Sequence, residues 1–71
     1  MIDINYKGYA IKLKNLPSNP EEWLVVVRDY QNQTIASDWY ENKQQGEEWA
    51  KSIIEKHISS LLSVPLLSLN S

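Results

Sequence analysis

The sequence contains no cysteine and no phenylalanine, and its 71 residues include only two glycines and one histidine. Without cysteine, no disulfide and no thiolate metal site can support the fold, and this composition fits a reducing compartment. The two glycines stand alone, which excludes a glycine-rich phosphate loop. A chain of this length forms one domain, near the size at which one apolar core only just offsets chain entropy. The core must therefore come from aliphatic side chains, three tryptophans and four tyrosines.

Long hydrophobic runs and an excess of positive charge are also lacking. A membrane span needs about 20 apolar residues, whereas the longest uncharged run, residues 58–71, is shorter and is interrupted by serines and Pro65. The first ten residues have no cationic flank followed by an apolar block, so we expect no signal peptide and a cytoplasmic protein without membrane partners. Seven basic against nine acidic residues give a net charge of −2. Since nucleic-acid binders are usually basic, this balance disfavours them without excluding a local patch.

Apolar side chains alternate along residues 2–13, first on even positions and then on odd ones. The change of phase falls at Lys7-Gly8. Either a tight hairpin or one long strand with a bulge would bring all six apolar side chains to one face. Lysine is a poor first residue for a primed two-residue turn, whereas glycine is common in bulges, so the composition favours the bulge.

The middle of the chain predicts a hairpin. Residues 15–21, NLPSNPE, predict a loop because they hold two prolines and two asparagines. Residues 22–29 are β-branched and aromatic and predict the clearest strand. A turn follows in which Asn32 suits a left-handed conformation, and residues 34–40 predict the next strand, antiparallel to the first.

A helix is predicted after Asn42, which is placed as its N-cap. Apolar residues then recur at spacings of three and four, at Ala50, Ile53, Ile54, His57, Ile58, Leu61 and Leu62. Gly46 falls on the same stripe and would let the first turn lie close to a bulky neighbour such as Trp23 or Trp39. Pro65 is expected to end the helix, because the residue before a proline avoids helical angles.

Together these elements predict an α+β domain of the order β-β-β-α. The antiparallel sheet has three strands, or four if Lys7-Gly8 is a turn, and one C-terminal helix packs on one face. Residues 1–64 form the single domain, and residues 65–71 form an apolar tail.

The strand over residues 22–29 is apolar on both sides, although one amphipathic helix covers only one face of a sheet. The side toward the helix is predicted to hold Tyr9, Ile11, Leu13, Trp23, Val25, Val27, Ile35 and Trp39. The far face then holds Ala10, Lys12, Lys14, Leu24, Val26, Arg28, Tyr30, Ala36, Asp38 and Tyr40.

Three explanations of this far face remain open: the tail folds back over it, a second copy covers it, or it binds another molecule. Burial of an apolar patch stabilises either of the first two arrangements. The predicted contact surface comprises Leu24, Val26, Tyr40, Leu61, Leu62, Leu66, Leu67 and Leu69. A homo-oligomer or a protein partner is therefore expected.

Residues for chemistry are scarce. His57 is the only histidine, and we interpret it as a partly buried side chain with one hydrogen bond, since no second ligand accompanies it. The acidic pairs Glu21-Glu22 and Glu47-Glu48 fit solvated positions. We predict no enzyme, no metal, no cofactor and no small-molecule substrate. A weaker alternative is a nucleic-acid surface in which Lys12, Lys14 and Arg28 hold phosphates and Tyr30 stacks on bases.

The order of the motifs I-x-Y-x-G-Y-x-I, W-L-V-V-V, T-I-A-S-D-W-Y and G-E-E-W-A-K-S-I-I resembles a loose group of small uncharacterised β-β-β-α proteins. Over residues 2–60 it also resembles the arm-type DNA-binding domains, a three-stranded sheet plus a helix, of some tyrosine recombinases. That resemblance implies a sheet face that enters the major groove. The leading prediction is a non-enzymatic interaction module that self-associates through the far face, the tail or both.

Overall fold

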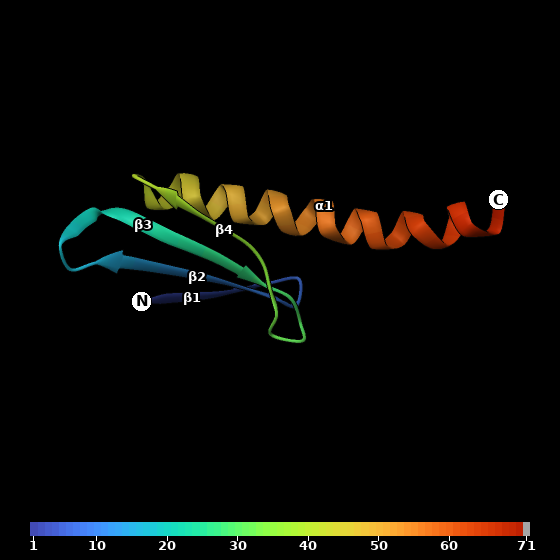
Figure 1. The fold of residues 1–71 in the computed structure, drawn as a ribbon, viewed down its shortest axis with the longest axis horizontal. Coiled ribbons are helices and arrows are strands. Elements are labelled where there is room, and N and C mark those ends of the chain that lie inside the picture. Colours follow the sequence, from blue (N-terminus) through green and yellow to red (C-terminus); the bar gives the residue numbers. More distant parts are fainter. Residues whose placement is uncertain (71) are drawn as a thin grey trace.

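The computed structural model describes the backbone of residues 1–70 and the side chains of residues 1–61. Four antiparallel strands lie in sequence order in one sheet, and one helix crosses a single face of it (Figure 1). The elements are β1 (Ile2–Tyr6), β2 (Tyr9–Leu16), β3 (Asn19–Arg28), β4 (Thr34–Tyr40) and α1 (Lys43–Asn70). The predicted α+β class is confirmed, with the larger of the two strand numbers.

The junction at Lys7-Gly8 is a tight turn, so the favoured bulge was wrong. Tyr6 pairs directly with Tyr9 across it, and both turn residues have positive φ, 53° for Lys7 and 86° for Gly8. Such angles are those of a primed turn, whose twist matches the twist of the flanking strands. The Lys7 side chain pairs with Glu55 of α1, a contact that local turn statistics do not contain.

The predicted loop over residues 15–21 is mostly strand. Only Pro17-Ser18 forms the turn, and Leu16 and Asn19 already pair across it. The register then shifts, leaving residues 20–22 without partners on β2. The Asn15 side chain bridges this irregular segment: its Nδ2 donates hydrogen bonds to the carbonyl oxygens of Pro20 at 2.8 Å and Glu22 at 3.3 Å. One amide thus satisfies two carbonyls that the ladder leaves open.

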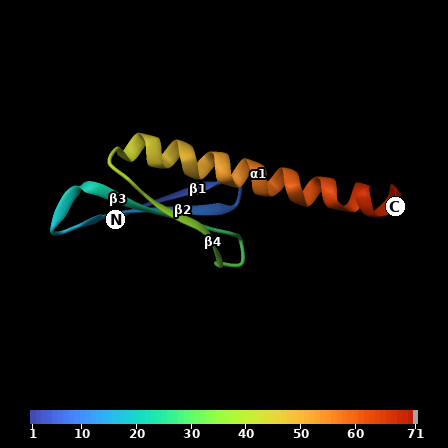
Figure 2. The ribbon, with the colours of Figure 1, turned by 45° about the horizontal axis from the view of Figure 1, so that its top comes forward.

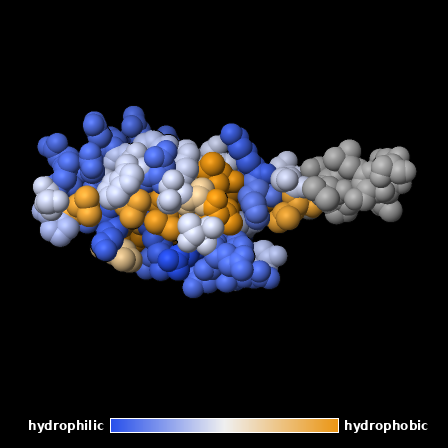
Figure 3. Space-filling view, viewed as in Figure 1, coloured by the Kyte–Doolittle hydropathy of each residue, from blue (hydrophilic) through white to orange (hydrophobic). Residues whose placement is uncertain are grey.

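The helix begins as predicted. The Asn42 side-chain oxygen accepts hydrogen bonds from the backbone N–H groups of Gln44 at 2.8 Å and Gln45 at 3.2 Å. Behind this cap, α1 packs against β2, β3 and β4. Figure 3 shows the resulting band of hydrophobic residues between helix and sheet. The fully buried core consists of Tyr9, Ile11, Leu13, Val25, Val27, Ala50 and Ile54.

The sequence predicted that the helix ends before Pro65. This prediction was wrong, because α1 continues to Asn70. Proline removes one helical hydrogen bond, yet its fixed φ near −65° matches the helix, and the surrounding leucines are strong helix formers. In both ribbon views the last turns of α1 extend beyond the ends of the strands (Figures 1 and 2). The helix therefore covers one sheet face and leaves the other to the strands alone.

Candidate interaction surface

The sheet face opposite α1, here called the second face, is defined by the strand register. Residues paired across neighbouring antiparallel strands point to the same side, so the register sorts the side chains into cross-strand rows. The first row holds Lys14, Leu24 and Trp39; the second holds Lys12, Val26 and Ser37; the third holds Ala10, Arg28 and Thr34. The predicted placement of Lys12, Lys14, Leu24, Val26 and Arg28 on one face is confirmed.

Exposure agrees with this assignment. Val25 and Val27, which point toward α1, are fully buried, whereas their neighbours Leu24 and Val26 are only half-buried. Trp39 is 46% exposed although it is the largest side chain of the face. The middle strand is thus apolar on both sides, and within the described residues only its α1 side is covered.

From Ala36 onward the predicted faces of β4 were wrong, whereas Ile35 packs against the core as predicted. Tyr40 pairs with Trp23 on the side of α1, and its ring lies 5.6 Å from that of Trp49 in the helix. Burial on this side raises the pKa of Tyr40 above its ordinary value. Trp39 takes the place beside Leu24 that had been predicted for Tyr40.

A bulge explains this inversion. Val27 pairs with Ala36 but Arg28 pairs with Thr34, so Ile35 is an extra residue in β4. An extra residue shifts the alternation of the strand by one position. Ala36 and Asp38 consequently point to the side of α1, contrary to the prediction. An unbroken alternation from Ile35 had been assumed, and no turn residue in the sequence marks the bulge.

Tyr30 also leaves the predicted surface. It lies in the turn after β3, is 71% exposed, and meets the ring of Tyr9 edge-on at 6.4 Å. Arg28 stays on the second face with its guanidinium turned toward that turn, where Nη1 donates to Asn32 Oδ1 at 3.4 Å. The basic-aromatic surface therefore consists of three cations and Trp39, without Tyr30.

Of the predicted contact residues of α1, Leu61 is the one whose side chain is among the described ones. Leu61 is 51% exposed. The side chains of Leu62, Leu66, Leu67 and Leu69 lie outside the described residues.

Two side chains of α1, His57 and Glu55, make polar contacts with the first hairpin. The half-buried His57 forms, through Nδ1, a 2.6 Å hydrogen bond with the Tyr9 hydroxyl, which confirms the structural interpretation of this histidine. Glu55 Oε1 accepts a hydrogen bond from the Tyr6 hydroxyl at 2.8 Å and pairs with the Lys7 ammonium. The hydrogen bonds from Lys7 and Tyr6 lower the pKa of Glu55. These polar residues hold the fold together and do not converge on an empty site.

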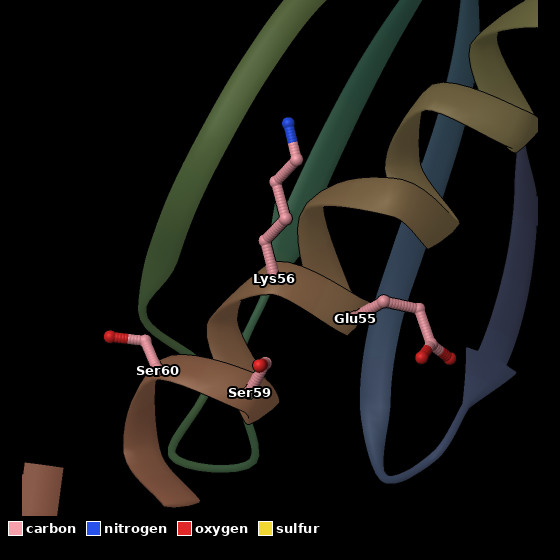
Figure 4. Close-up of a pocket in the computed structure, with 4 residues that line it drawn as sticks. All are labelled: Glu55, Lys56, Ser59 and Ser60. Atoms are coloured by element: carbon pink, nitrogen blue, oxygen red, sulfur yellow. The ribbon is translucent and has the colours of Figure 1, made fainter. Parts of the chain in front are cut away.

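A hollow of about 590 Å³ lies beside the helix and is lined by Glu55, Lys56, Ser59 and Ser60. All four residues come from successive turns of α1, and in Figure 4 Glu55 and Lys56 point to opposite sides of it. Ligand sites are usually apolar concavities with a few converging polar groups. This hollow has neither property, so the second face is the stronger candidate.

No group of three or more His, Asp or Glu side chains in the described residues is placed to hold a metal ion. Nor does any helix in that part of the chain have the length and apolar character needed to cross a bilayer. Comparisons with known protein families, curated proteins and solved structures gave no match. The candidate surface consequently rests on its own geometry.

Proposed function

We propose that this protein is a small, cytoplasmic, non-enzymatic interaction module that self-associates through the second face. The observation that carries the proposal is the row of Lys14, Leu24 and Trp39, in which a half-exposed tryptophan stands beside an apolar residue of the central strand. Apolar burial contributes about 25 cal/mol per Å². A complex that buries this row and the neighbouring Val26 is therefore stabilised by that burial.

A pair of matched substitutions tests which apolar surface makes the contact. Leu24→Glu places a carboxylate at the centre of the second face, whereas Leu61→Glu places the same group on the exposed side of α1. Neither side chain belongs to the buried core, so both variants are expected to fold. The mass in solution is measured over a range of concentrations by sedimentation.

We expect the wild type and Leu61→Glu to associate as concentration rises and Leu24→Glu to remain monomeric. The reverse result would transfer the contact to the helix. A wild-type chain that stays monomeric at every concentration would contradict self-association altogether.

Nucleic-acid binding is the second candidate, because Lys12, Lys14 and Arg28 share the second face with Trp39. Cations along a backbone and an aromatic ring for stacking are the parts that such a surface requires. Single- and double-stranded oligonucleotides are titrated at low salt, with the three cations changed to Glu in the comparison variant. Binding that is absent, or indifferent to salt and to these changes, would eliminate this candidate.

A further inference from the structure

The second face is asymmetric about its central strand. On the β2 side of Leu24 and Val26 stand two ammonium groups, Lys14 and Lys12, and Asp3 of β1 lies beside Lys12 on the same face. On the β4 side stand Trp39 and Ser37, which carry no charge. A surface with cations along one flank and an aromatic ring along the other is complementary to a copy of itself, provided that the copy is turned so that unlike flanks meet.

A second copy can be laid face to face in two ways, and each is generated by a different twofold axis within the plane between the sheets. An axis perpendicular to the strands lays each strand over its own counterpart in the reverse direction, so β2 would lie over β2 and Lys14 would meet either Lys14 or Lys12 of the other copy. Like charges placed opposite one another destabilise the pair. An axis parallel to β3 exchanges the flanks, which sets each Lys14 opposite the other copy's Trp39 and leaves Leu24 against Leu24.

We propose that a second copy of this chain packs on the second face about an axis parallel to β3 and near Leu24, with Lys14 of each copy over Trp39 of the other. This inference rests on the proposed self-association and specifies its geometry. Sheets pack face to face about 10 Å apart, a gap that a lysine and an indole fill together. Tryptophan is the best aromatic partner for a cation–π interaction with a side-chain cation.

Arg28 is compatible with this arrangement. It lies four residues from Leu24 along β3, about 13 Å at the usual rise per residue. Because aligned sheets cross at about 30°, the axis bisects that angle and is parallel to β3 only to within about 15°. The two copies of β3 therefore lie about 7 Å apart sideways at Arg28, and the Arg28 guanidinium is turned toward Asn32. The two arginines therefore do not face each other closely.

The size of the face sets the strength of the complex. Three rows across four strands span about 400 Å² per copy, from the spacing of strands and residues in a sheet. The total of about 800 Å² is below the range of about 1,200–2,000 Å² typical of stable interfaces. We thus expect a weak dimer that forms as the concentration rises and dissociates on dilution.

The test uses two full-length variants, Lys14→Glu and Trp39→Lys, each alone and mixed in equal amounts. Alone, the first faces its new carboxylate with a tryptophan and the second faces its new ammonium with Lys14, so neither should associate. In the mixture, the new carboxylate meets the new ammonium and the remaining Lys14 meets the remaining Trp39. We expect the mixed dimer to be about tenfold tighter than either variant dimer. Leu61→Glu serves as the control, since it should mix without preference.

The outcomes separate this inference from the proposed function. A wild type that never associates removes both. A wild type that associates and is disrupted by Leu24→Glu, while the two variants fail to pair, leaves self-association standing and overturns the twofold arrangement. Should either charged variant fail to fold, Lys14→Ala and Trp39→Ala replace them, because their mixed dimer retains one Lys14–Trp39 contact and each variant dimer retains none.

Discussion

Gly46, in the first turn of α1, lies where the helix and the sheet approach closely. A Cβ added there would lie 2.6 Å from Val25 Cγ2 and 3.5 Å from Tyr40 Cβ. Val25 is fully buried and β-branched, so it has no room to move aside. Gly46→Ala gains about 1 kcal/mol of helix propensity but overpacks the core, which costs about 1–3 kcal/mol. We expect a net loss of stability in chemical denaturation.

Ser52→Ala is the matched control, because Ser52 is exposed in the same helix and alanine there adds propensity without a clash. The double variant Gly46→Ala/Val25→Ala should lose less stability than the sum of the losses of the two single variants, which corresponds to a favourable coupling energy between the two sites. A Gly46→Ala variant as stable as the Ser52→Ala variant would show that the helix shifts outward at little cost.

At the scale of single residues, the sequence predicted what depends on near neighbours. Asn42 caps the helix and Asn32 has a φ of 64° in its turn, because both preferences arise from a side chain and its own backbone. The close approach at Gly46 was also predicted, but with the wrong partners. Trp23 or Trp39 was expected, and Val25 and Tyr40 were found. Tyr40 takes the place of Trp39 because the bulge at Ile35 inverts the faces of β4, whereas Val25 lies two residues from Trp23 on the same face of β3.

At the scale of elements, the β1–β2 hairpin is fastened to α1 through Glu55. The hydrogen bonds from Lys7 and Tyr6 hold the pKa of this carboxyl below its ordinary value near 4.5. A carboxyl whose folded-state pKa is depressed contributes stability that is fully present above the unfolded value and is lost as the pH falls through the folded value. Glu55→Gln should therefore destabilise the protein at pH 7, and the difference from wild type should shrink below pH 4.5.

Stability against pH is measured for the wild type, Glu55→Gln and Glu48→Gln. Glu48 is an exposed glutamate of the same helix and controls for the removal of one negative charge. Parallel curves for the two variants would mean that the contact with the hairpin contributes nothing. The effect is expected to weaken at high salt, because both partners of the ion pair are about half exposed.

Elements whose form depends on distant contacts were among the ones the sequence failed to predict. Lys7-Gly8 forms a turn with the help of a glutamate 48 residues later, and turn statistics do not include that partner. The loop predicted over residues 15–21 failed for a more local reason, because the amide of Asn15 satisfies carbonyls only five and seven residues later and the strands continue up to Pro17-Ser18. The alternation of β2 and β3 was read correctly because no bulge interrupts either strand between Ala10 and Asn15 or between Trp23 and Arg28.

At the scale of the whole molecule, a single helix on a four-stranded sheet leaves a choice between two uncovered surfaces. The second face presents Leu24, Val26 and Trp39, and the end of α1 runs past the sheet with Leu61 half exposed. The order of residues in β3 alone predicted that both sides of this strand are apolar. The identity of the aromatic residue beside Leu24, in contrast, depended on the bulge at Ile35. The candidate surface was thus predicted at its centre and mistaken at its β4 flank.

A shortened chain decides how much the end of the helix contributes. The described α1 side chains that pack on the core extend to Ile58, so a chain ending at Ser60 keeps all of them. We expect its free energy of unfolding to match the full chain within about 0.5 kcal/mol, and its association to persist, because the second face is intact. A chain ending at Lys56 removes His57 and Ile58 and should be clearly less stable. Loss of association on shortening to Ser60, with stability unchanged, would assign the contact to residues 61–71 and not to the second face.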